Sequence, residues 1–332
     1  MNLFRKSLYP LSLIYDAVTR IRNIAYDLNW FKHQSFDIPT IVVGNLSTGG
    51  SGKTPMIEYL LRRFSNQHSV AVLSRGYKRQ SGGFVIGGHK TSVEDLGDEP
   101  FQLAKKFPHV KVAVSKNRPL GIQKLLTTHS SLDAVFLDDG YQHRKLKPSF
   151  QILLTTYASP WFHDCVLPAG NLRESSKGKN RADVIVVTKC PDDLSNEEQN
   201  KFAKQLRINV NQNLFFTSIS YDSVVQGDKK MQVSSFVKKP FVLVTGIANP
   251  KPLISYLDDL SCEYTHFEFP DHHFFSASDL KKITSMGLPI LTTEKDYVRI
   301  GSLLENVFFL PIALKFLGNE EKFLTSIENQ FC

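Results

Sequence analysis

The sequence predicts an α/β protein with a doubly wound parallel sheet and a second, smaller α/β domain. Short apolar runs rich in β-branched residues recur along the chain, at intervals filled by helical or loop sequence. Near-continuous apolar strands are typical of parallel sheets that are covered on both faces. A glycine-rich turn joins the first of these runs to a helical segment. The length of 332 residues is enough for about two domains.

Two sets of predicted strands define the expected domains. The first set is 40–44, 70–74, 110–115, 134–139, 150–156 and 183–189, and the second is 241–247, 265–269, 289–293 and 306–312. The stretch between the sets, 209–239, is polar and rich in turn residues, and it contains "LFFTSIS" as a candidate linker strand. We therefore expect a first domain at 34–210, a linker at 211–240 and a second α/β domain at 241–332.

The N-terminal segment, 1–33, is expected to contain an amphipathic helix. Apolar residues share one face of this helix, namely Leu11, Ile14, Val18, Ile21, Ala25 and Leu28. Polar residues share the other face, namely Ser12, Asp16, Arg20, Asn23 and Asp27. The pattern alone fits two interpretations: a helix that lies on a membrane surface, and a helix that docks on its own domain.

Composition limits the classes of function. The net charge of +8 suits a polyanionic partner, such as an acidic membrane surface or a phosphorylated substrate. Nucleic acid is not expected, because the basic residues are dispersed and not interleaved with aromatic ones. The four cysteines are scattered, which disfavours a zinc site or disulfide framework. We expect a cytoplasmic protein, because there is no signal peptide and no apolar run of roughly 18–20 residues.

The turn after the first predicted strand has the features of a phosphate-binding loop. Its sequence "STGGSGKT" matches the pattern G-x-x-x-x-G-K-[ST] except at the first position, where serine replaces glycine. The expected cofactor-binding residues are Ser47, Thr48, Gly49, Gly50, Ser51, Gly52, Lys53 and Thr54. Backbone N–H groups at a helix start converge on an anion. We expect Lys53 to reach the β- and γ-phosphates and Thr54 to bind Mg²⁺.

A second element of a nucleotide site is an acidic pair at the end of a predicted strand. Asp138 and Asp139 end the run "AVFLDD". Carboxylates at such a position favour a magnesium site, whereas the structural alternative is an acidic turn before Gly140. Both interpretations remain open from the residues alone.

The sequence favours ATP over GTP. GTP-hydrolysing switches usually read guanine through [NT]-K-x-D after a late strand. Here the corresponding strand ends in "TKCPDD", in which Pro191 occupies the position of the acid and Asp192 comes one step late. A P-loop GTPase that acts as a switch or metallochaperone remains the alternative function.

Further polar clusters lie in predicted loops. They are "SRGYKR" (74–79), "LGDEP" (96–100), "SKNR" (115–118), "GNLRES" (170–175) and "FPDHHFF" (269–275). Arg75, Arg118 and Arg173 are candidates for clamping phosphate oxygens, because the arginine fork suits that geometry. The His272–His273 pair has no further Cys or His nearby to complete a metal site, and it is more typical of a structural or acid/base element.

These motifs, in order, resemble the tetraacyldisaccharide 4'-kinase family of lipid A biosynthesis. The resemblance rests on "VGNLSTGGSGKTP", "SRGY", "GDEP", "DDGYQH", "NLRE", "VVTK", "GIANP", "FPDHH" and "TEKD", and it covers nearly the whole chain. It implies a P-loop NTPase-like sheet domain and a second α/β domain joined by a short β linker. The implied reaction uses ATP and Mg²⁺ to phosphorylate the 4'-hydroxyl of an acylated glucosamine disaccharide 1-phosphate. The implied location is the cytoplasmic face of the inner membrane of a Gram-negative bacterium.

The resemblance also implies roles for individual residues. Asp138 and Asp139 lie in the magnesium region, and Glu174 of "NLRE" is a further carboxylate associated with the metal. Asp98 of "GDEP" takes the proton of the acceptor hydroxyl, supported by His272 of "FPDHH".

Two further expectations follow from the same resemblance. Arg118 stabilises charge on the transferred phosphate. A lipid acceptor that stays in the bilayer favours the membrane interpretation of the N-terminal helix, with an anionic membrane surface as partner. No obligate protein partner is implied.

Overall fold

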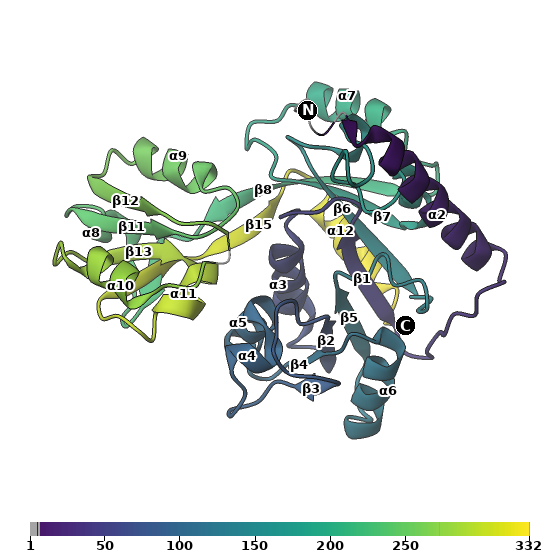
Figure 1. The fold of residues 1–332 in the computed structure, drawn as a ribbon, viewed down its shortest axis with the longest axis horizontal. Coiled ribbons are helices and arrows are strands. Elements are labelled where there is room, and N and C mark those ends of the chain that lie inside the picture. The colour runs from purple at the N-terminus through teal and green to yellow at the C-terminus, as the bar shows by residue number, and fades with distance from the viewer. Residues whose placement is uncertain (1–4, 6, 272, 332) are drawn as a thin grey trace. The chain divides into compact units, whose positions relative to one another are not determined.

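The computed structural model describes residues 5, 7–271 and 273–331. Its contacts divide the chain into two compact units (Figure 1). The first unit takes the chain as far as Ile219 and again from Leu314 onward, and the second unit is Ser220–Ala313.

Within the described residues, the first unit is built on a nine-stranded sheet with the strand order β15-β8-β7-β6-β1-β5-β2-β4-β3. The strands are β1 (Thr40–Asn45), β2 (Val70–Ser74), β3 (Val85–Ile86), β4 (Lys111–Val114), β5 (Ala134–Asp138), β6 (Phe150–Thr156), β7 (Val184–Thr188), β8 (Asn213–Tyr221) and β15 (Ile312–Phe316). The pairs from β8 to β4 are parallel, and the short β3 is antiparallel to β4. The parallel sheet was predicted from the apolar runs, and this prediction is confirmed.

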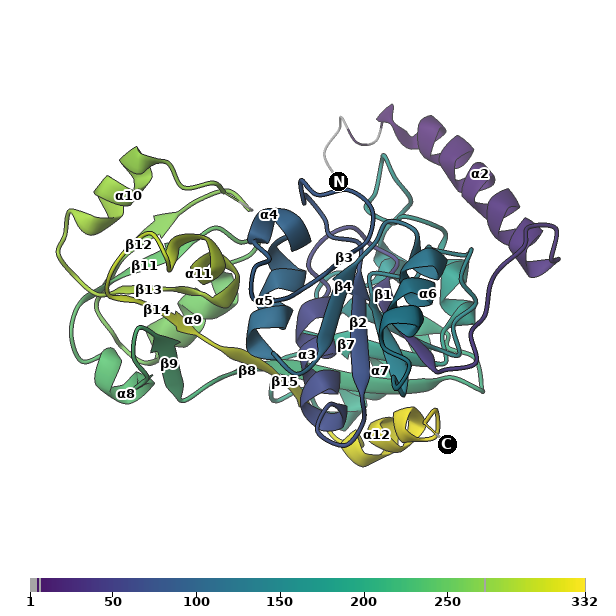
Figure 2. The same cartoon turned by 90° about the horizontal axis from the view of Figure 1, so that it is seen from below.

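Helices cover both faces of this sheet. The helices of the unit are α2 (Tyr9–Asp27), α3 (Lys53–Phe64), α4 (Val93–Leu96), α5 (Asp98–Lys106), α6 (Arg118–Thr128), α7 (Asn196–Leu206) and α12 (Glu320–Glu328), with two 3-10 turns, Trp161–His163 and Ser176–Arg181. In β1, Ile41 packs with Phe64 of α3, whereas Val42 packs with Leu125 of α6. Alternate residues of one strand therefore fill opposite cores, as a doubly wound sheet requires. Figure 2 shows α5 and α6 on opposite sides of β2 and β4.

The second unit has its own six-stranded sheet in the described residues, with the order β10-β9-β14-β13-β11-β12. Its strands are β9 (Val224–Gly227), β10 (Met231–Gln232), β11 (Phe241–Thr245), β12 (Tyr264–Glu268), β13 (Ile290–Thr293) and β14 (Val307–Leu310), and its helices are α8 (Val233–Phe236), α9 (Lys251–Asp259), α10 (Ala277–Thr284) and α11 (Glu294–Ile300). Strands β11 to β14 are parallel, so the expected second α/β domain is present.

The division of the chain differs from the expected one at the C-terminal end. Strand β15 lies beside β8 in the first sheet, and Phe323 of α12 is fully buried in the core of the first unit. The Tyr59 hydroxyl donates a hydrogen bond of 2.6 Å to Glu320 Oε1. The end of the segment expected as a second domain at 241–332 thus returns to the first unit. The segment expected as a linker at 211–240 is shared between the two sheets.

Helix α2 docks on the first unit through its polar face. The Ser12 hydroxyl accepts a hydrogen bond of 2.9 Å from the Ala169 N–H. Asn23 donates a hydrogen bond of 2.6 Å to the carboxylate of Glu174. Hydrogen bonds from polar side chains thus contribute to this interface, beside the packing of Tyr15, Ala25 and Tyr26. An amphipathic helix usually turns its apolar face toward the protein, so this orientation is reversed.

The apolar face of α2 remains exposed, and Figure 2 shows the helix at the periphery of the unit. Ile14, Val18 and Ile21 expose 63, 60 and 67% of their surface. Ala25 is the exception, because it is buried against the unit. No helix in the described part of the chain has the length and apolar character needed to cross a bilayer.

Candidate active site

Polar residues end several strands at the same edge of the first sheet. Asn45, Ser74, Asp138 and Thr188 are the last residues of β1, β2, β5 and β7, and all four are buried. The carboxyl ends of parallel strands meet at one edge, which is where open α/β sheets bind ligands. The predicted loop and acidic pair therefore lie at the same edge.

The predicted phosphate loop joins β1 to α3. Gly52 adopts φ +86 immediately before the helix, a left-handed conformation that favours glycine. Two hydrogen bonds of 2.7 Å fix the preceding residues: Asn45 donates to the Ser47 carbonyl, and the Thr48 N–H donates to the Asn171 carbonyl. Among the described residues the N-cap position of α3 is Gly52, which has no side chain to cap the helix, so the first N–H groups of α3 can face an anion.

Lys53, the first residue of α3, meets the acidic pair. Its Nζ lies 3.5 Å from Asp139 Oδ1 and 3.3 Å from Asn45 Oδ1. These contacts hold the ammonium at the carboxyl end of β1, beside the loop. Thr54 follows in the first turn of α3 and is half-buried.

Asp138 has the environment of a cation ligand. The Ser74 hydroxyl donates a hydrogen bond of 3.0 Å to its Oδ2, whereas its buried Oδ1 has no hydrogen-bond partner in the described part of the chain. Burial, with the nearby charges of Glu99 and Asp139, raises its pKa to about 6. A buried carboxylate with an unmet acceptor is costly unless a cation or donor completes it. The residues present therefore fit a divalent cation.

Asp139 stays ionised. Burial raises its pKa, but the charges of Lys53 and Arg173 outweigh burial and hold the pKa below its usual value. Arg173 NH1 donates to both carboxylate oxygens, at 3.0 and 2.9 Å. Among the described residues no group of three or more His, Cys, Asp or Glu is arranged to hold a metal. Mg²⁺ typically uses one or two carboxylates together with substrate phosphates, which is consistent with this pair.

Glu174 lies beside this pair but is engaged with other side chains. It is fully buried and forms hydrogen bonds of 2.8 and 3.1 Å with Arg181. Gln142 donates to it at 3.1 Å and also accepts from Arg173 at 3.5 Å. The network thus connects Glu174 to Asp139 through Gln142 and Arg173.

Arg118 joins the ends of two strands. Its NH2 donates to the Asp138 carbonyl at 2.5 Å and its NH1 to the Ser115 carbonyl at 3.2 Å. Burial lowers its pKa to about 10, so the guanidinium remains protonated near neutral pH. Its charge is therefore close enough to interact with both carboxylates of the acidic pair.

Asp98 is the first residue of α5. Gly97 precedes it with φ +85, and a Cβ at Gly97 would lie 2.7 Å from the Tyr77 carbonyl oxygen. The next residue, Glu99, is close enough to contribute to the raised pKa of Asp138, so the start of α5 lies near the end of β5. The expected partner of Asp98, His272, lies outside the described residues.

Several residues of this network were not predicted from the sequence. Asn45, Ser74, Gln142 and Arg181 contact the lysine or the carboxylates named above. Asn45 and Ser74 could have been found from one signal, a polar residue at the last position of an apolar strand. Arg181 gives no comparable signal, because it follows the "NLRE" motif in a polar turn.

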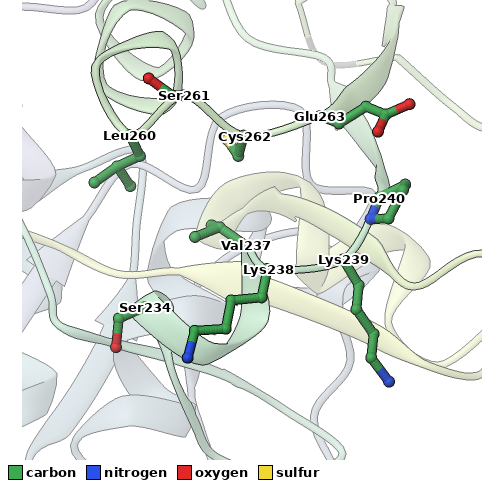
Figure 3. A pocket seen from close by; sticks show the side chains of 9 residues that line it. All are labelled: Ser234, Val237, Lys238, Lys239, Pro240, Leu260, Ser261, Cys262 and Glu263. Atoms are coloured by element: carbon green, nitrogen blue, oxygen red, sulfur yellow. The ribbon is translucent and has the colours of Figure 1, made fainter.

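A separate open pocket of about 560 Å³ lies in the second unit (Figure 3). It is lined by Ser234, Val237, Lys238, Lys239, Pro240, Leu260, Ser261, Cys262 and Glu263. None of the residues predicted to bind nucleotide, metal or acceptor lines it. The predicted site residues that the structure describes all lie in the first unit.

Comparison with known proteins identifies relatives along the entire chain. The family model described as tetraacyldisaccharide-1-P 4'-kinase matches residues 4–332. The tetraacyldisaccharide 4'-kinase of Flavobacterium johnsoniae is 47% identical over 332 residues, covering 98% of this chain and 97% of the relative. That of Bacteroides thetaiotaomicron is 39% identical over 345 residues, covering 95% of this chain and 90% of the relative.

A solved structure is similar as well. The crystal structure of LpxK from Aquifex aeolicus in complex with ATP matches with a TM-score of 0.82 and 32% sequence identity. The match covers 99% of this chain and 100% of that chain. The likeness therefore extends over both units.

Proposed function

Because this chain belongs to the tetraacyldisaccharide-1-P 4'-kinase family, we propose that it transfers the γ-phosphate of ATP to the 4'-hydroxyl of tetraacyldisaccharide 1-phosphate, a step of lipid A biosynthesis. One observation supports this chemistry most strongly. Lys53, at the open N-terminus of α3, lies 3.5 Å from Asp139 of the acidic pair. A phosphate-binding lysine and a cation site thus adjoin each other, as phosphoryl transfer requires.

The loop residues 47–54 bind the phosphates of ATP in this proposal. Backbone N–H groups and the Lys53 ammonium hold the β- and γ-phosphates. Thr54, Asp138 and Asp139 would hold Mg²⁺, and the ion would supply positive charge to the phosphate oxygens. Glu174 acts on the metal region through Gln142 and Arg173, because its own oxygens are bonded to Arg181.

The acceptor is activated by Asp98. The 4'-oxygen forms a bond to the γ-phosphorus while the bond from that phosphorus to the β–γ bridging oxygen breaks, and ADP leaves. The hydroxyl proton passes to the Asp98 carboxylate, with His272 supporting the base. Arg118 contributes positive charge beneath the phosphates, through its position at the end of β5.

The acceptor's acyl chains require the enzyme to work at a lipid surface. The exposed apolar face of α2 and the net charge of +8 suit an anionic bilayer. We place this surface at the cytoplasmic face of the inner membrane, as the family resemblance implies. The relatives described above come from Gram-negative bacteria.

The test is incubation of the full chain with γ-labelled ATP, Mg²⁺ and the disaccharide lipid, followed by chromatography of the lipid. We expect label in the lipid, and we expect Lys53→Ala to reduce transfer by about 100- to 1,000-fold. Lys201→Ala, an exposed lysine of α7, is the matched control. Release of labelled phosphate without labelled lipid, or a preference for GTP, would instead favour the P-loop GTPase.

A further inference from the structure

The end of β7 packs against the phosphate loop. The buried Thr188 hydroxyl donates a hydrogen bond of 2.8 Å to the carbonyl of Ser51 in the loop. A Cβ at Gly52 would lie 3.6 Å from Thr188 Cβ. The carboxyl end of β7 therefore forms one wall of the loop, although the mechanism above assigns it no role.

Lys189, the next residue, has two unusual features. Its backbone adopts φ +56, a left-handed conformation that is uncommon outside glycine and that clusters at functional sites. Its ammonium lies 3.7 Å from the position of a Cβ on Gly50, at the centre of the loop. In the described part of the chain this ammonium has no ion-pair partner, and burial lowers its pKa. The residue as a whole is exposed to solvent, so the left-handed backbone and the nearness of the ammonium to the loop, rather than burial, indicate a ligand.

The strand order indicates which end of the nucleotide Lys189 faces. Strand β1 has β5 as one neighbour and β6 as the other, with β7 beyond β6. Lys53 and the acidic pair fix the terminal phosphates on the β5 side of the loop. We therefore expect a nucleotide that follows the loop from its terminal phosphate to extend its nucleoside away from β5, toward the side of β6 and β7.

We propose that Lys189 binds the nucleoside of ATP. Its four-carbon stem gives the base an apolar surface on which to lie, and its ammonium, which lies near Gly50, donates to a ribose oxygen. This assignment rests on the proposed use of ATP. The nearby Asp192 does not read the base, because its Oδ1 is bonded to Ser218 at 2.6 Å and to Lys315 at 3.3 Å.

The test compares two probes that share phosphates but differ in the nucleoside. Calorimetric titration of the full chain with ADP and with inorganic tripolyphosphate, both with Mg²⁺, gives the two affinities. We expect Lys189→Ala to weaken ADP binding by about 10-fold, the scale of one base-stacking contact. Tripolyphosphate binding should change by less than about twofold, within the range of a substitution that touches no ligand atom.

Additional variants separate the contributions of the side chain. Lys189→Met keeps the stem and should lose less ADP affinity than Lys189→Ala. Lys189→Gly suits the left-handed backbone, so it shows the binding defect without strain. Lys201→Ala is the control for the loss of a surface lysine.

Two other outcomes would overturn the assignment of Lys189 to the nucleoside. Equal weakening of ADP and tripolyphosphate would make Lys189 a phosphate ligand. Unchanged binding of both by Lys189→Ala and Lys189→Gly would remove it from the nucleotide site. Neither titration contains the lipid acceptor, so a failure of the proposed transfer reaction would leave this result intact and distinguishable.

Discussion

Asn23 Nδ2 on α2 lies 2.6 Å from Glu174 Oε2, so the N-terminal helix is hydrogen-bonded to a buried carboxylate of the candidate site. Glu174 in turn connects through Gln142 and Arg173 to Asp139. The helix with the exposed apolar face is thus linked by hydrogen bonds to the side chains around the acidic pair. A change in the position of α2 would therefore alter the hydrogen bonding of Glu174.

Asn23→Ala should loosen α2 without unfolding the unit. Hydrogen bonds to charged groups contribute about 1.5 to 3 kcal/mol, so docking of the helix should weaken by that amount. Amide hydrogen exchange should become faster in α2 and remain unchanged in α3. Arg20→Ala is the control, because the half-exposed Arg20 forms its ion pair with Asp16 of the same helix, so the variant removes a charge from α2 without removing the hydrogen bond to Glu174. Unchanged amide hydrogen exchange in Asn23→Ala would mean that the other contacts of α2 are enough to hold the helix on the unit.

Replacement of Ile14, Val18 and Ile21 by serine should release the protein from anionic vesicles. Each exposed side chain can bury enough apolar surface in a bilayer to contribute about 1 kcal/mol, so the triple variant should bind roughly 100-fold more weakly. Its melting temperature should stay unchanged, because all three side chains are exposed. Cosedimentation with vesicles measures the effect.

The control for this variant replaces exposed leucines elsewhere on the chain. Leu120→Ser and Leu303→Ser remove apolar surface outside α2 and should leave vesicle binding intact. Equal binding by the triple variant and the parent would show that α2 does not provide the membrane contact.

Most strands could be predicted because each is a local apolar run, and the structure gives these nearly the same bounds. The short strands β3, β9 and β10, and β15 near the C-terminal end, were not predicted. The place of the C-terminal segment could not be predicted in the same way. The apolar residues of β15 and α12 show that both elements are buried, but not against which core. Phe323 packs in the cluster that contains Tyr59 and Phe215, which lie far away in the sequence.

The candidate site could also be predicted only where it depends on local sequence. The loop and the acidic pair follow from local motifs, and parallel topology brings the strand ends to one edge. The hydrogen bond from Asn23 to Glu174 joins residues 151 positions apart, and no local pattern encodes it. The polar face of α2 was predicted, but the docking of that face was not.

Phe323→Ala should destabilise the first unit specifically. Its side chain is fully buried, and truncation of a buried phenylalanine costs about 3 to 5 kcal/mol. Denaturant unfolding, followed by hydrogen exchange in each unit, should show faster opening in β1 and β6 and no change in β11 and β13. Phe274→Ala is the matched control, because Phe274 is 82% exposed in the second unit. Faster hydrogen exchange confined to the second unit would contradict the assignment of α12 to the first unit.

Glu58 of α3 holds the helix that begins with Asp98. Its Oε2 lies 2.6 Å from Lys106 Nζ and its Oε1 accepts from Gln102 at 3.0 Å, both on α5. Glu58→Leu removes one partner of a largely buried ion pair, which should cost about 3 to 5 kcal/mol. Glu58→Leu with Lys106→Met replaces both charges and should recover most of the free energy of unfolding. The double variant should still transfer phosphate more slowly at saturating ATP, because α5, the helix that carries Asp98, has lost its hydrogen bond from Gln102 to Glu58. Parental turnover in a stable double variant would show that the pair serves stability alone.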